Sequence, residues 1–196
     1  MRRAMGEGFL NRHGGERRER TVIRAALFVA LSVALGFLLG AIPNVELISL
    51  SVFLGGVFCG ARAGALIGVL SESFFSLFNQ LGPAPAPLFA AQVAGFALIG
   101  LCGGLLGPRL AAGGAGAVAV SALAGLVLTL GYEALTNLAT AFIALGPRKM
   151  LDGLGGVFLA GALFTVVHAG VNTAVFAAAV APVMRVAGSL DRGGAR

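Results

Sequence analysis

The sequence predicts an all-α integral membrane protein in which six transmembrane helices form a bundle with both termini in the cytoplasm. Hydrophobic residues make up 58% of the 196 residues and charged residues only 11%, whereas a soluble domain is about half apolar and about a quarter charged. The mean hydropathy is +0.94. The 31 glycines suit helices that pack closely in lipid, where small residues let backbones approach.

Apolar stretches of suitable length follow one another along the chain. At about 20 residues per span, the chain holds about six spans and no separate soluble domain. We expect the spans at residues 22–42, 47–59, 63–80, 88–106, 115–145 and 157–183. The fifth stretch is longer than a lipid core of about 30 Å requires at about 1.5 Å per residue, so it should protrude, tilt or bend near Gly131.

The basic residues give the chain its expected orientation and its three parts. Residues 1–20 are polar and are expected to be disordered or to lie on the membrane surface, residues 21–185 form the membrane domain, and residues 186–196 form a cytoplasmic tail. With an inside N-terminus, all of the 14 basic residues except Arg148 and Lys149 are cytoplasmic, as the positive-inside rule requires. The net charge of +6 then reflects orientation and contact with anionic membrane lipid, with no role in nucleic-acid binding.

Small residues recur at helical spacing in two places. Glycines repeat every four residues from Gly56 to Gly68, which predicts tight antiparallel packing of the second and third spans. The first span carries Ala26, Ala30 and Ala34 at the same spacing. On the residues alone, these alanines favour ordinary packing inside one bundle over a surface for another subunit.

Polar side chains within the apolar stretches form a candidate substrate-binding site. A carboxylate at membrane depth costs a few kcal/mol, so it should face a cavity or a partner and not lipid. Any single polar residue here is more often an interhelical hydrogen-bonding group, but together they predict a cavity for a polar solute. The candidates are Asn44, Glu46, Glu72, Asn79, Gln80, Gln92, Tyr132, Glu133, Asn137, His168 and Asn172.

The charges within the spans indicate the class of solute. The apolar stretches contain Glu72 and Glu133 but no Arg or Lys at mid-depth. A buried carboxylate without a cation takes up a proton or needs a positively charged guest. We therefore expect a neutral or cationic small molecule whose donors meet Glu72, Gln92, Glu133 and Asn137. A ring in that molecule would pack on three phenylalanines, Phe75, Phe78 and Phe89.

Several short motifs accompany this layout: AALFVALSVALG in the first span, PNVELISL before the second, NQLGPAPAP, YEALTNLATA and FTVVHAGVN. Together with six spans of this size, they resemble the S component, the substrate-binding membrane subunit of energy-coupling-factor (ECF) vitamin transporters. The resemblance covers residues 21–185. It implies uptake of a vitamin-like micronutrient, bound from outside, in the plasma (inner) membrane of a prokaryote.

The resemblance also implies partners and roles. In that family a membrane coupling subunit and two cytoplasmic ATPase subunits complete the importer, and the alanine stripe of the first helix packs on the coupling subunit. Ala26, Ala30 and Ala34 would make that contact here, and the link at residues 43–46 would be the gate over the substrate. The chain has no Walker A motif, so the partners would hydrolyse ATP. We expect no cofactor, no metal and no enzymatic activity in this chain.

Three other classes of function fit part of the sequence. A rhomboid-type intramembrane protease could pair Ser71 or Ser73 with His168, but neither serine lies in a GxSG motif. A scaffold of the rod-shape-determining type has a similar helical layout and needs no polar cavity. Transport of a metal ion has little support, because one histidine with scattered carboxylates lacks a diagnostic ligand spacing.

Overall fold

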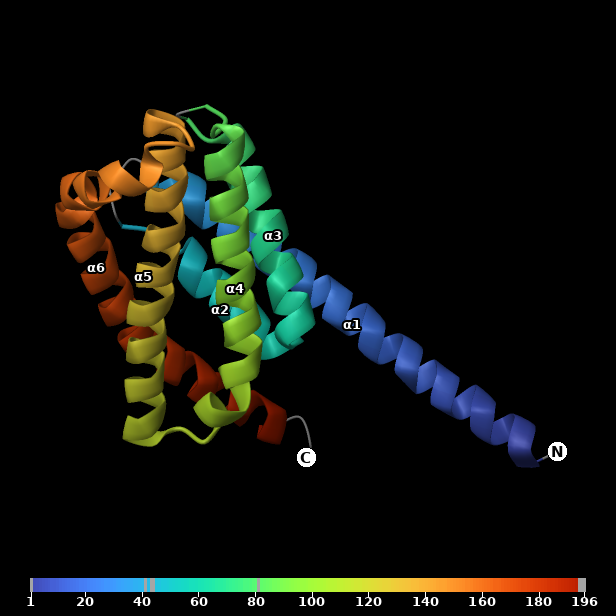
Figure 1. The fold of residues 1–196 in the computed structure, drawn as a ribbon. Coiled ribbons are helices and arrows are strands. Elements are labelled where there is room, and N and C mark those ends of the chain that lie inside the picture. The colour runs from blue at the N-terminus through green and yellow to red at the C-terminus, as the bar shows by residue number, and fades with distance from the viewer. Residues whose placement is uncertain (1, 41, 43–44, 81, 194–196) are drawn as a thin grey trace.

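The computed structural model describes residues 2–40, 42, 45–80 and 82–193, with side chains described from Arg18 to Ser189 within these ranges. These residues form six helices and no strand. The helices are α1 (Arg2–Leu39), α2 (Ile48–Cys59), α3 (Ala61–Phe78), α4 (Ala86–Ala111), α5 (Gly114–Leu145) and α6 (Met150–Gly193). Figure 1 shows α2 to α6 as a bundle, from which the N-terminal part of α1 projects.

Five of the helices are long and apolar enough to cross a membrane. The suitable segments are Arg18–Leu39, Ala61–Phe78, Ala86–Ala111, Gly114–Leu145 and Met150–Ser189. The remaining helix, α2, has only 12 residues. This composition is compatible with a multi-pass membrane protein.

Several helices extend beyond the predicted spans. α1 continues back to Arg2, through the segment for which the sequence predicts disorder or a surface position. α4 runs past Pro108 to Ala111, and α6 starts at Met150 and continues to Gly193. Once a helix exists, each added residue gains a hydrogen bond at little further cost, and no proline interrupts residues 2–39. Hydropathy therefore located the apolar cores of these helices but not their ends.

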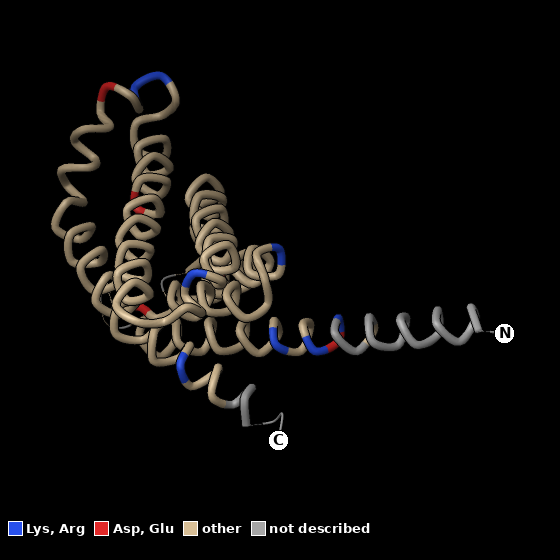
Figure 2. Tube along the Cα trace, turned by 90° about the horizontal axis from the view of Figure 1, so that it is seen from below, with Lys and Arg blue, Asp and Glu red and all other residues tan. Residues whose placement is uncertain are grey.

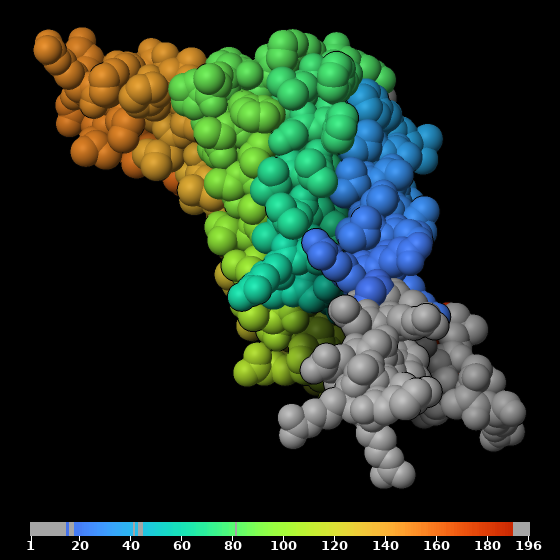
Figure 3. All heavy atoms as spheres, turned by 90° about the vertical axis from the view of Figure 1, so that its right-hand side faces the viewer, coloured from blue at the N-terminus to red at the C-terminus, as the bar shows by residue number. Residues whose placement is uncertain are grey.

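The hairpin of α5 and α6 reaches beyond the other helices. α5 runs without interruption through Gly131 for 32 residues, about 48 Å at about 1.5 Å per residue, so the helix does not break at Gly131. Figure 3 shows the start of α6, in orange, projecting away from the face that α1, α3 and α4 form. In Figure 2 the basic residues of the link between α5 and α6 lie far from those of α1 and of the end of α6.

The closest backbone contacts join α4 to α2 and α3, along a line that we call the glycine seam. A Cβ atom on Gly100 would overlap the carbonyl oxygen of Gly64, and one on Gly56 would overlap the carbonyl oxygen of Gly100. The seam consists of Gly56, Gly64, Gly68, Gly100, Gly103 and Gly104. The predicted packing of the second span on the third is thus only part of the arrangement, because α4 brings glycines of its own against both.

The position of α2 explains where the bundle leaves space. α2 is about 18 Å long at about 1.5 Å per residue, which is shorter than any of its neighbours. Its buried Phe53 packs on Phe176 of α6, with ring centroids 5.1 Å apart, and Ser51 accepts a hydrogen bond of 2.9 Å from Ser32 of α1. Because α2 begins only at Ile48, the space between the other helices on the N-terminal side of Ile48 is not filled by a helix.

Candidate functional site

A cavity of about 270 Å³ occupies this space, between the helices and the link that joins α1 to α2. Six of the eleven predicted site residues line it, and they come from four helices and the link. They are Glu46 of the link, Glu72 of α3, Gln92 of α4, Tyr132 and Glu133 of α5, and His168 of α6. The convergence of these residues, which are far apart in the sequence, agrees with the expected polar cavity.

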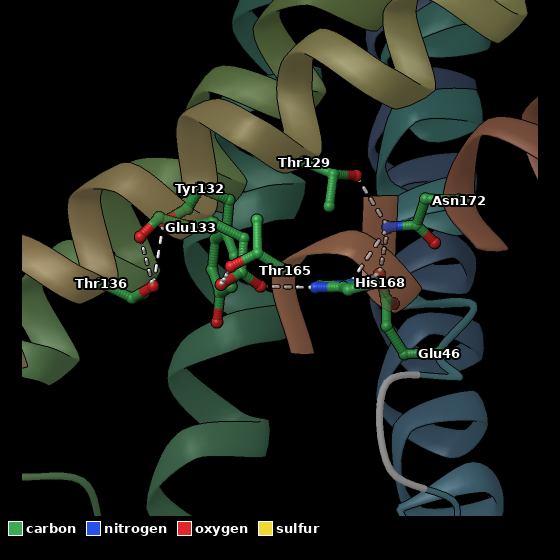
Figure 4. A network of polar contacts seen from close by, with 8 residues as sticks. All are labelled: Glu46, Thr129, Tyr132, Glu133, Thr136, Thr165, His168 and Asn172. Carbon is green, nitrogen blue, oxygen red and sulfur yellow. Dashed lines mark hydrogen bonds and ion pairs between the residues drawn. The ribbon is translucent and has the colours of Figure 1, made fainter. Parts of the chain in front are cut away.

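On one side of the cavity, His168 joins two carboxylates (Figure 4). Its Nδ1 lies 2.7 Å from Oε1 of Glu133, and its Nε2 lies 3.5 Å from Oε1 of Glu46. The Thr165 hydroxyl donates a hydrogen bond of 3.2 Å to the other oxygen of Glu133. Because both oxygens of Glu133 are engaged and a histidine lies beside it, Glu133 is not the carboxylate without a cationic neighbour that the sequence predicts.

Asn172 ties the link between α1 and α2 to the same cluster. Its Nδ2 donates to Glu46 Oε1 at 3.1 Å and to the Thr129 hydroxyl at 2.9 Å. Glu46 Oε2 in turn accepts a 2.8 Å hydrogen bond from the backbone N–H of Ser49, one of the free donors at the start of α2. Burial by itself would raise the pKa of Glu46, but the hydrogen bonds from His168 and Ser49 outweigh it and hold that pKa below its ordinary value.

The opposite side of the cavity leaves its carboxylate without a partner. Glu72 is only 2% exposed, and its Oε2 is buried with no hydrogen-bond partner among the described residues. Gln92 nearby accepts a hydrogen bond of 2.9 Å from the Ser76 hydroxyl. A buried carboxylate without a partner is costly while it is charged, so Glu72 either takes up a proton or needs a donor that the described residues do not supply.

Aromatic rings complete the lining. Phe75 and Phe96 reach the cavity together with Tyr132, and the rings of Phe96 and Tyr132 meet edge to face with centroids 5.4 Å apart. A Cβ atom on Gly95 would lie 2.7 Å from Cδ2 of Tyr132. Gly95 therefore lets the Tyr132 ring lie directly against α4.

The other predicted site residues lie elsewhere. Asn79 and Gln80 line a neighbouring cavity of about 170 Å³, which shares Gln92 with the first. Asn172 is buried behind the lining. Asn137 lines neither cavity, and its Nδ2 is buried without a partner among the described residues. Asn44 lies outside the described residues, as does Pro43 of the expected gate.

Two of the three phenylalanines predicted as ring contacts do not line the cavity. Phe78 is 68% exposed and Phe89 does not line the cavity; only Phe75 does. On α3, positions 72, 75, 76 and 79 share one helical face, and residue 78 points away from it. Phe96 and Thr129 were missed, although each is four residues from a predicted site residue, Gln92 and Glu133 respectively.

The protease alternative receives no support from the contacts of Ser71, one of its two candidate serines. Ser71 is fully buried, and its hydroxyl has no partner among the described residues. The ring nitrogens of His168 lie instead beside Glu133, Glu46 and Asn172. Within the described part of the chain, no group of three His, Cys, Asp or Glu side chains could hold a metal ion.

Comparisons of the chain with protein-family models, with curated proteins and with solved structures found no match. Function is therefore inferred from the cavity and the surfaces around it.

Proposed function

We propose that the chain is a substrate-binding membrane subunit of the S-component kind, which takes up a small, vitamin-like, neutral or cationic molecule from outside and delivers it with a coupling subunit and two ATPases. The observation that carries the proposal is the cavity of about 270 Å³ with Glu46, Glu72, Glu133 and His168 in its wall, inside helices otherwise apolar enough for lipid. Ionisable groups at such depth are typical of a path or site for a solute. A scaffold of the rod-shape-determining type would not need them.

The proposal includes a topology. All six helices, α2 among them, would form the membrane domain of a prokaryotic plasma membrane protein with both termini in the cytoplasm. The separation of Arg148 and Lys149 from the other basic groups supports it (Figure 2). Labelling of single cysteines in intact cells tests this part, since an impermeant reagent should reach a cysteine at position 84 and not one at position 190.

The decisive experiment for the binding function is native mass spectrometry of the purified protein. We expect a small molecule to remain bound and to be displaced when the cavity is filled by a Gly36→Leu substitution, because Gly36 lines the cavity. A Cβ atom there would already lie 2.6 Å from Ile48 Cδ1. A protein that retains no small molecule, and that binds none from a panel of vitamins, would contradict the proposal.

The proposed partner surface is the alanine stripe of α1. Ala26, Ala30 and Ala34 are exposed, and the first two border an apolar groove of about 590 Å³ between α1 and α3. Such a face allows close approach of another helix in lipid.

Ala30→Trp tests this surface. We expect the variant to lose co-purification with the coupling subunit and to lose uptake, while the solitary protein keeps its bound molecule. Ala160→Trp, at an exposed position of α6, is the matched control and should keep both. Unchanged co-purification of the Ala30 variant would exclude the stripe as the contact.

A further inference from the structure

We infer that the cavity binds an organic cation carrying N–H groups, with Glu72 as its counter-ion. The inference rests on the proposed function, in which the cavity holds a small solute, and it narrows the class of that solute. It depends on the charge balance of the lining, on the unpartnered oxygen of Glu72 and on the rings around it.

The charge balance of the cavity is negative. Its described lining contains three carboxylates, Glu46, Glu72 and Glu133, one histidine and neither Lys nor Arg. His168 lies between Glu46 and Glu133, so any positive charge that it carries is already shared by those two. The carboxylate of Glu46 is close enough to Glu72 to interact with it electrostatically. No protein cation in this lining is left for Glu72.

The hydrogen bonding of Glu72 points to a donor that the protein does not supply. Glu72 is buried, and its Oε2 has no partner among the described residues. Buried charges in proteins are ordinarily paired and hydrogen-bonded. The nearby amide of Gln92 is hydrogen-bonded to Ser76 and Tyr132. It does not reach Glu72 Oε2, which has no partner among the described residues. A guest with a positively charged N–H group would supply both the charge and the donor.

The rings and the volume constrain the rest of the guest. Phe75, Phe96 and Tyr132 line the cavity, and Tyr132 lies within electrostatic range of all three carboxylates. Aromatic faces attract cations as well as flat rings. The cavity of about 270 Å³ is slightly smaller than pockets for drug-sized ligands, which hold about 300–1,000 Å³. A flat cation of one ring, or of two fused rings, fits these limits.

Four matched compounds test the inference on the purified, full-length protein. Benzamidine is a flat cation with N–H donors, benzamide is its neutral counterpart, benzoate is the anion, and phenyltrimethylammonium is a cation without N–H groups. We measure equilibrium binding and the shift in unfolding temperature with each compound. Benzamidine should bind at least about tenfold more tightly than the other three. The free energy of a hydrogen bond to a buried charge corresponds to a change in affinity of about this size.

Glu72→Gln is the critical variant. It keeps the size of the side chain and breaks no hydrogen bond that the structure shows at Oε2, so the protein should still fold. We expect it to reduce the affinity for benzamidine about tenfold or more and to remove the preference over benzamide. Asp152→Asn, which removes the same charge at the start of α6 and outside the cavity, should retain the preference.

The possible failures of this inference and of the proposed function are different. Binding of benzamide or benzoate as tight as that of benzamidine, a preference that survives Glu72→Gln, or no binding by either cation would overturn the inference. A neutral or anionic molecule found in the cavity by native mass spectrometry, with an affinity that Glu72→Gln leaves unchanged, would also overturn it and leave the proposed function intact. A cavity that binds no small molecule of any charge would contradict both.

Discussion

The carboxylates on two opposite walls of the cavity differ in their hydrogen bonding. On the bonded wall, formed by Glu46, Glu133 and His168 with Asn172 behind them, each carboxylate accepts hydrogen bonds, with distances from 2.7 to 3.5 Å. On the open wall, formed by Glu72, Phe75 and Gln92, the carboxylate has a buried oxygen with no partner among the described residues. The difference separates carboxylates that hold segments of the protein together from one whose buried oxygen the described residues leave without a donor.

The largest expected effect comes from removing the centre of the bonded wall. His168→Ala would leave Glu46 and Glu133 in a partly buried site without the ring that joins them. Removing one member of a buried ion pair costs about 3–5 kcal/mol, and we expect a loss near the lower end because the carboxylates are 21% and 17% exposed. Unfolding in detergent measures this loss. An unchanged unfolding temperature would show that the cluster contributes nothing to stability.

Acid should weaken the bonded wall through Glu46. The pKa of Glu46 is held below its ordinary value of 4.5, so its contribution to stability is complete above about pH 4.5 and is lost as the pH falls through the lower pKa of the folded protein. Unfolding temperatures measured from pH 7 downward should therefore fall more steeply for the wild type than for Glu46→Gln. Parallel curves for the two proteins would rule out this role.

The smallest effect on stability is expected on the open wall. Glu72→Met replaces a buried, unpartnered carboxylate by an apolar side chain of similar size, so stability should change by less than about 1 kcal/mol or should rise. Glu133→Met is the matched substitution on the bonded wall and should destabilise by about 1–3 kcal/mol, since it removes the partner of His168 and Thr165. Equal losses for the two variants would contradict the distinction between the walls.

Much of the fold could be predicted because its signals are local. The six helices correspond to six apolar stretches, and the short α2 was expected to be short. The ends of α1 and α6 could not be predicted from hydropathy, which reports the preference for lipid and not how far a helix continues into polar sequence. The partners of the repeated glycines depend on α4, which lies distant in the sequence from Gly56.

The sequence predicted six of the residues that line the cavity, but not how they pair. Spacings of four residues place Glu133 with Asn137 and His168 with Asn172 on shared helical faces. Whether His168 forms hydrogen bonds with Glu133, Glu46 or Glu72 depends on the rotation of α6 relative to α5 and to the link. No local sequence pattern predicts this rotation. The position of Phe78 outside the cavity could not be predicted for the same reason, because an aromatic residue near a polar face can point to either side of it.

The glycine seam has a mechanical consequence. Side chains that separate two helices act as a compressible layer, because rotamers can shift and let the backbones slide. At Gly64 and Gly100 no such layer exists, and the two backbones touch directly. α2, α3 and α4 therefore form one block in which backbone lies directly against backbone. We therefore expect a movement that widens the cavity to come from the elements that contact this block through side chains: α1, the link that follows it, and the hairpin of α5 and α6.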